Sequence, residues 1–293
     1  MPPGTAAMAP SPKMTSLPPA KRFDWSNLGL RVASAAVMVP AALAAVWFGG
    51  WAYLVLVSVG VTLLSFEWGS MSAKASPVRV SVLVMVAVLA GVFLMHHDRY
   101  VLAWAAVAVG AVAAAMLAGG AIERRADAGL GVLYIAPAAL ALVWLRDSNE
   151  TLSHQGAWWT LMLFAATWMA DIGAFAVGSA LKGPKLWPRF SPNKTWSGFV
   201  GGLGAATAVG ASMAAFSQFQ LNTWAAGLIG LLVGLATMGG DLWESALKRR
   251  FGVKDSGDLI PGHGGLLDRV DGLMFAAVAM AIARLANHWG WGH

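Results

Sequence analysis

Nine apolar runs, each about as long as a membrane-spanning helix, cover most of this 293-residue chain. A helix that crosses a bilayer needs about 20 mostly apolar residues. Only 12% of the residues are charged, against about 25% in soluble proteins, so a protein that folds in water is excluded. We therefore expect an all-α integral membrane protein, a polytopic bundle of about nine transmembrane helices at 28–48, 51–68, 78–95, 100–119, 128–145, 157–180, 196–216, 223–246 and 270–287.

The chain divides into three parts by composition. Residues 1–24 contain six prolines and scattered basic residues, which predicts a disordered, Pro-rich basic tail. The apolar run after it resembles a signal peptide but is longer than the 7 to 15 residues of a secretory core, so we expect a retained first helix. Residues 25–150 then hold about five transmembrane helices, of which the run interrupted by Pro137 is the weakest. Residues 151–293 hold the remaining helices and the polar loops.

The basic residues predict the orientation of the bundle. With nine spans, 17 of the 20 lysines and arginines fall on one side, and only Arg99, Arg146 and Arg284 on the other. The positive-inside rule then places the N-terminus and the polar loops in the cytoplasm. The net charge of +6 is explained by basic loops beside an anionic leaflet, and no motif indicates a nucleic-acid partner. The absence of cysteine excludes thiolate chemistry and cysteine-ligated metals.

Two polar features lie between residues 171 and 198. Asp171 falls inside an apolar run, where a carboxylate costs at least about 2.5 kcal/mol and needs a partner or a wet cavity; a structural and a functional role are equally open. The following loop carries Lys182, Lys185, Arg189 and Lys194 with the hydroxyls of Ser191 and Thr195, just before a helix. Lysines and a helix N-terminus both favour anions, so the loop is either a polyphosphate cradle or only a topology signal.

Eleven of the 20 basic and 14 acidic residues lie between Asp241 and Asp271. Asp241, Glu244, Ser245 and Lys248 fall on one helical face, and Asp268 and Asp271 lie one turn apart at the start of the last helix, where negative charge is favoured. Carboxylate oxygens suit Mg²⁺. The alternative is that these acids only neutralise the neighbouring cations.

This segment resembles the phosphatidate cytidylyltransferase family, also called CDP-diacylglycerol synthases. The family signature is filled over 27 residues by Ser245-Ala-Leu-Lys248-Arg249, four residues, and Lys254-Asp255-Ser-Gly257-Asp-Leu-Ile260-Pro261-Gly-His263-Gly264-Gly265-Leu-Leu-Asp268-Arg269-Val-Asp271. Asn193 and Ser197 depart from the family pattern, which often has a lysine and an acid there. By motif, the resemblance covers about the last 130 residues.

The resemblance implies transfer of a cytidylyl group from CTP to phosphatidic acid, giving CDP-diacylglycerol and pyrophosphate, in the C-terminal region 151–293. It implies a Mg²⁺ ion, with or without a second, monovalent cation, bound by Asp241, Asp268 and Asp271. These three acids, together with Lys248 and His263, are the implied catalytic residues. For His263, a role as acid and a role in hydrogen bonding are both open. It implies a homodimer in the cytoplasmic (inner) membrane with its active site facing the cytoplasm. The implied substrate-binding residues are Ser191, Asn193, Lys194, Thr195, Ser245, Arg249, Lys254, Asp255 and Arg269.

Two other functions remain open. A related CTP-dependent lipid enzyme with a different lipid substrate would have the same apolar helices. A secondary transporter would also place carboxylates in a helical bundle, but near the bilayer midplane on interrupted helices. Here the acids fall at the ends of the apolar runs, beside a polar loop.

Overall fold

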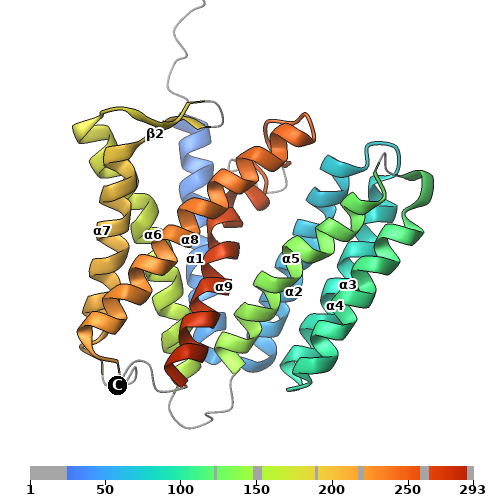
Figure 1. Ribbon diagram of the computed structural model, residues 1–293, viewed down its shortest axis with the longest axis horizontal. Coiled ribbons are helices and arrows are strands. Elements are labelled where there is room, and N and C mark those ends of the chain that lie inside the picture. Colours follow the sequence, from blue (N-terminus) through green and yellow to red (C-terminus); the bar gives the residue numbers. More distant parts are fainter. Residues whose placement is uncertain are drawn as a thin grey trace, which may run out of the picture.

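The computed structural model describes residues 25–121, 124–147, 154–188, 191–216, 221–257 and 264–288, and within them the chain is a bundle of long helices (Figure 1). The expected tail at 1–24 and the expected catalytic His263 lie outside the described residues. The helices are α1 (Trp25–Phe48), α2 (Gly50–Ser72), α3 (Pro77–His96), α4 (Tyr100–Leu117), a short 3-10 helix η1 (Gly119–Ala121), α5 (Ala126–Asp147), α6 (Gln155–Leu181), α7 (Trp196–Met213), α8 (Thr223–Arg250) and α9 (Leu267–His288).

Each expected apolar run corresponds to one of these helices. Seven of the helices in the described residues are long and apolar enough to cross a membrane, namely α2 to α6, α8 and α9. The segment Ala33–Phe48 of α1 is also apolar, and the glycine-rich α7 is not among the seven. Pro137 lies inside α5 without ending it, because neighbouring helices can satisfy the backbone groups that a proline frees in a membrane helix.

Successive helices run in opposite directions, so the connections gather at two ends of the bundle. At one end, His96 Nδ1 lies 2.6 Å from Asp147 Oδ2, which joins the C-terminal ends of α3 and α5. The rings of Trp47 and His154 stack there with centroids 5.1 Å apart. The opposite end holds the segment between α6 and α7 and the turn between α8 and α9 (Figure 1).

A β-hairpin connects α6 to α7, where the sequence predicted only a loop. Strand β1 (Lys185–Trp187) pairs antiparallel with β2 (Ser191–Thr195), with Lys185 opposite Thr195. Pro184 and Pro188 keep this segment from continuing the helix, because proline lacks the donor that a helix needs. The hairpin is a departure from an all-α chain within the described residues, and it brings β2 against the start of α7.

The helices form two groups that meet along α5 and α9. Helices α2 to α5 contact one another, as do α6 to α9, and α5 contacts both α6 and α9. Glycines permit close approach within the second group: a Cβ placed on Gly210 would lie 2.9 Å from the Cα of Gly230. Small residues have this role at helix contacts in membranes. A similar glycine contact joins α8 to α9 at the end of the bundle that holds the hairpin.

Candidate active site

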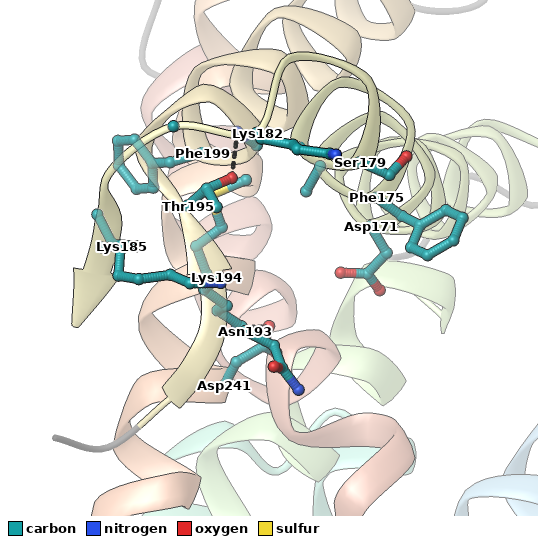
Figure 2. Close-up of a pocket in the computed structure, with 16 residues that line it drawn as sticks. Asp171, Phe175, Ser179, Lys182, Lys185, Asn193, Lys194, Thr195, Phe199 and Asp241 are labelled. Atoms are coloured by element: carbon teal, nitrogen blue, oxygen red, sulfur yellow. Dashed lines mark hydrogen bonds and ion pairs between the residues drawn. The ribbon is translucent and has the colours of Figure 1, made fainter. Parts of the chain in front are cut away.

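A cavity of about 750 Å³ opens at the hairpin end of the bundle, between α6, the hairpin, α7 and α8. Figure 2 shows Asp171 extending from α6 into the cavity, opposite the side formed by β2 and Asp241. Three lysines and two aspartates contribute its charge. The lining residues are Asp171, Ala174, Phe175, Gly178, Ser179, Lys182, Gly183, Lys185, Leu186, Asn193, Lys194, Thr195, Gly198, Phe199, Met238 and Asp241.

The hairpin places Lys194 against the carboxylate of Asp241 on α8, and the two form an ion pair. The side chain of Lys194 is 34% exposed and that of Asp241 is 22% exposed, so both remain accessible from the cavity. The next residue, Thr195, caps α7: its Oγ1 accepts a hydrogen bond from Gly198 N–H at 3.1 Å. Thr195 therefore helps to fix the direction in which β2 presents Lys194.

Lys182 ends α6 in a strained backbone conformation, with φ 53° and ψ −133°. Non-glycine residues rarely adopt a positive φ, and the strain persists only where surrounding contacts impose it. Ser197 Oγ donates a hydrogen bond to the carbonyl of Lys182, and Lys182 N–H donates to Gly178 O at 3.0 Å. These contacts hold a third lysine at the cavity beside Lys185 and Lys194.

Helices α8 and α9 cross at Gly240 and Gly272. A Cβ placed on Gly240 would lie 3.0 Å from the Cα of Gly272, and one placed on Gly272 would lie 2.8 Å from Asp241 Oδ1. This contact brings Asp241 beside Asp271, whose carboxylate interacts electrostatically with both Asp241 and Glu244. Two of the three acids expected to bind metal thus lie together.

The third acid, Asp268, is held by other partners. Lys248 Nζ donates to Asp268 Oδ1 at 2.6 Å, and Ser256 N–H donates to Asp268 Oδ2 at 3.1 Å. Lys248 also pairs with Glu244 Oε2 at 2.7 Å, one turn earlier on α8. The predicted helical face that carries Glu244 and Lys248 on α8 is confirmed. Lys248 bridges Glu244 on α8 and Asp268 on α9.

Glu67 on α2 reaches this turn from the other half of the bundle. Its side chain accepts hydrogen bonds from the backbone N–H groups of Leu266 at 2.6 Å and Leu267 at 2.7 Å, and from Ser256 Oγ at 3.2 Å. Sequence reasoning missed Glu67 because it assigned the polar chemistry to the C-terminal half. A carboxylate inside an apolar run was the signal that could have found it.

The expected site residues separate into two neighbouring groups. Asn193, Lys194, Thr195 and Asp241 line the cavity, and Asp271 lies next to Asp241. The remaining described residues of the expected set lie outside the cavity lining: Ser191 at the start of β2, Ser245, Lys248 and Arg249 on α8, Lys254 and Asp255 after it, and Asp268 and Arg269 in the first turn of α9. Of these, Arg249, Lys254, Asp255 and Arg269 are exposed.

The oxygen ligands at the helix crossing suit a magnesium ion. Mg²⁺ binds through one or two carboxylates and keeps waters and substrate phosphates as its other ligands, and Asp241 and Asp271 supply two. The buried Oε1 of Glu244 has no hydrogen-bond partner among the described residues. Within those residues, no three acidic or histidine side chains are grouped closely enough to hold a metal by themselves. A metal ion at Asp241, Asp268 and Asp271 stays a prediction.

The fold and the site together define a polytopic helical membrane protein with a cationic cavity beside paired carboxylates at one end. Residues 29–286 match the model of the cytidylyltransferase family, and the chain belongs to this family. It is 37% identical over 256 residues to the phosphatidate cytidylyltransferase of Brucella suis biovar 1 (strain 1330), covering 87% of this chain and 92% of that protein. The phosphatidate cytidylyltransferase of Staphylococcus aureus (strain COL) is 40% identical over 151 residues, 51% of this chain and 56% of that protein.

Proposed function

We propose that this protein transfers the cytidylyl group of CTP to phosphatidic acid, forming CDP-diacylglycerol and pyrophosphate. The observation that carries the proposal is the ion pair of Lys194 with Asp241, because it joins the cationic cavity to the carboxylates of the α8–α9 crossing. A nucleotidyl transfer between two polyanions needs cationic side chains for the phosphates and carboxylates for a metal ion in one place. Family membership over residues 29–286 supports the same reaction.

The lipid phosphate needs little activation to act as the nucleophile. A phosphate monoester has a second pKa of about 6, so its oxygen is ionised at neutral pH. The protein must instead neutralise the two substrates and align them for in-line attack at the α-phosphorus of CTP. The lysines of the cavity, Lys182, Lys185 and Lys194, supply positive charge for phosphate groups. The new P–O bond forms as the bond to pyrophosphate breaks, and the same charges then stabilise the departing pyrophosphate.

Asp241 and Asp271 would hold a Mg²⁺ ion, and the carboxylate of Glu244 is near enough to Asp271 to interact with it electrostatically. When bound, the ion supplies charge neutralisation at the phosphates of CTP. Lys248 holds Asp268 and Glu244 in place between α8 and α9. The expected monovalent cation stays a prediction, which a comparison of the activity in potassium and in N-methylglucamine salts tests.

The position of the site fits substrates that arrive from different phases. The cavity lies at one end of the helices, and the outer face of α6 beside it is apolar, with Phe175 78% and Ile172 57% exposed. CTP would come from water and the lipid from the bilayer.

We propose that α1 and α7 span the membrane with the seven helices named above, that the N-terminus and cavity face the cytoplasm, and that the membrane is the cytoplasmic (inner) one. The expected homodimer also stays a prediction, which light scattering of the purified protein in detergent tests.

The reaction is tested with purified protein in detergent, CTP, Mg²⁺ and phosphatidic acid. We expect pyrophosphate and a cytidine-bearing lipid in equal amounts. Diacylglycerol and dolichyl phosphate in place of phosphatidic acid test the related CTP-dependent lipid enzymes. Product with either of these lipids and none with phosphatidic acid would contradict the proposal.

A further inference from the structure

A buried carboxylate on α2 joins the N-terminal half of the bundle to the helix that carries two of the proposed catalytic acids. Glu67 is 2% exposed. Its Oε1 accepts the N–H of Leu266 and its Oε2 accepts the N–H of Leu267, at 2.6 Å and 2.7 Å. These two amides lead directly into α9, which begins at Leu267.

The first amides of a helix have no acceptor within the helix and require one from outside. An acid is well suited, because it also interacts with the positive end of the helix dipole, and hydrogen bonds to a charged acceptor are shorter and stronger than neutral ones. Helix N-termini usually obtain this acceptor from a residue close in sequence. Here the acceptor comes from a different helix about 200 residues earlier, so it fixes α9 relative to α2.

Ser256 links Glu67 to Asp268. Its hydroxyl donates to Glu67 Oε2 at 3.2 Å, and its backbone N–H donates to Asp268 Oδ2 at 3.1 Å. A Cβ placed on Gly265 would overlap Ser256 Oγ and lie 3.1 Å from Asp268 Oδ2. The segment is packed so closely that a shift of the Glu67 carboxylate would move Ser256 and, with it, one oxygen of Asp268.

We infer that Glu67 is a positioning residue: by holding Leu266, Leu267 and Ser256, it sets the position of the first turn of α9 and thereby of Asp268 and Asp271. Asp271 lies one turn beyond Asp268, next to Asp241 at the glycine crossing. The position of its carboxylate relative to Asp241 depends on how α9 starts. The inference rests on the proposed function, because it assigns Glu67 to the geometry of the same carboxylates.

The test measures Mn²⁺ binding to the purified protein in detergent, with Mn²⁺ alone and no nucleotide or lipid. Glu67→Gln keeps the shape of the side chain but replaces one carboxylate oxygen by an amide NH₂. Only one acceptor oxygen then remains for the backbone N–H groups of Leu266 and Leu267. Loss of a residue that orients metal ligands typically weakens metal affinity 10- to 100-fold, and we expect the Kd of Mn²⁺ to rise about tenfold. Hydrogen exchange of the amides at 264–272 should also quicken. Ser65→Ala is the matched control, because Ser65 is buried on the same helix and, within the described part of the chain, its hydroxyl bonds only to Val61 O, at 2.7 Å.

Two further variants keep the test informative if Glu67→Gln folds poorly. Glu67→Asp keeps the charge but is shorter by one methylene, so it should restore part of the affinity. Ser256→Ala removes the hydroxyl donor but keeps the N–H to Asp268, so it should raise the Kd by about two- to threefold, as expected for one weaker hydrogen bond. A loss of folded protein lowers the number of Mn²⁺ ions bound per chain but leaves the Kd of the folded fraction unchanged.

The inference is overturned if the Kd of Glu67→Gln equals that of the wild type and of Ser65→Ala, or if the wild type binds no Mn²⁺. A failure of the proposed function gives a different result. In that case the wild type would bind Mn²⁺, and the variants would weaken the binding as expected, yet CTP and phosphatidic acid would give no cytidine-bearing lipid.

Discussion

Lys194 on β2 and Asp241 on α8 form an ion pair across the wall of the cavity. The pair joins a strand and a helix that are 47 residues apart in sequence, and both side chains remain partly exposed. The ammonium group is therefore available to a phosphate oxygen, while the carboxylate is available to a cation. We interpret the pair as the junction between the proposed nucleotide-binding and the proposed metal-binding parts of the site.

Lys194→Ala should raise the KM for CTP about tenfold or more, because a hydrogen bond to a charged group contributes about 1.5 to 3 kcal/mol. The maximal rate should fall less than kcat/KM, provided that the remaining lysines still hold the nucleotide. Steady-state kinetics over a range of CTP concentrations measure both. Lys74→Ala is the control, since Lys74 is exposed between α2 and α3 and does not line the cavity. An unchanged KM in Lys194→Ala would remove the hairpin from the CTP site.

Asp271→Asn and Asp268→Asn should each lower the rate of cytidylyl transfer at least about 100-fold, the scale for removing a group that stabilises developing charge. The proteins should still fold, because the asparagine has nearly the same shape as the aspartate. Activity and the thermal unfolding midpoint in detergent measure the two effects separately. Asp98→Asn serves as control, because Asp98 is exposed at the opposite end of the bundle. A variant of either catalytic acid with half the wild-type activity would contradict the metal assignment.

Gly240→Ala should destabilise the α8–α9 crossing by about 1 to 3 kcal/mol, as overpacking does, and should lower activity by separating Asp241 from Asp271. The added Cβ would lie 2.5 Å from Asp271 O and 3.0 Å from the Cα of Gly272. The neighbouring Gly239→Ala is a matched control, because a Cβ there meets no atom within 4 Å. Thermal unfolding and activity should distinguish the two variants, and equal values for both would refute the close crossing.

Orientation can be tested by cysteine labelling, since the chain has no cysteine of its own. Lys74→Cys lies at the same end as the cavity and Arg99→Cys at the opposite end, and both positions are exposed. With an impermeant maleimide added outside intact spheroplasts, we expect labelling of Arg99→Cys only. Labelling of Lys74→Cys alone would reverse the proposed orientation.

The helices were predictable from sequence because a bilayer requires long apolar segments whose backbone bonds are satisfied internally. The placement of Asp268 at a helix start and the face of α8 that carries Glu244 and Lys248 followed from local spacing, and the structure confirms both. The hairpin was not predicted, because strands of three and five residues in a polar loop carry no periodic signal. The contacts of Asp268 with Lys248 and Ser256 were also beyond reach, because they depend on how α8, α9 and the residues between them pack.

Glu67 illustrates a second limit of local reasoning. Its partners, Leu266 and Leu267, are backbone amides about 200 residues away, and no pattern along the chain relates the two segments. A lone carboxylate in an apolar run indicates that a partner exists but not which one; Asp171 was interpreted in this way from the sequence, and Glu67 was not. Only the packing of α2 against the turn before α9 identifies it.

The central claim is that the lipid phosphate attacks the α-phosphorus of CTP, and the fate of each CTP phosphate tests it most directly. Purified protein is incubated with phosphatidic acid, Mg²⁺ and CTP labelled with ³²P at either the α- or the γ-position, and lipid and aqueous products are separated. We predict that the α-label enters the lipid and the γ-label appears only in pyrophosphate. A γ-label in the lipid would indicate phosphoryl transfer and contradict the account, as would the absence of α-label from the lipid.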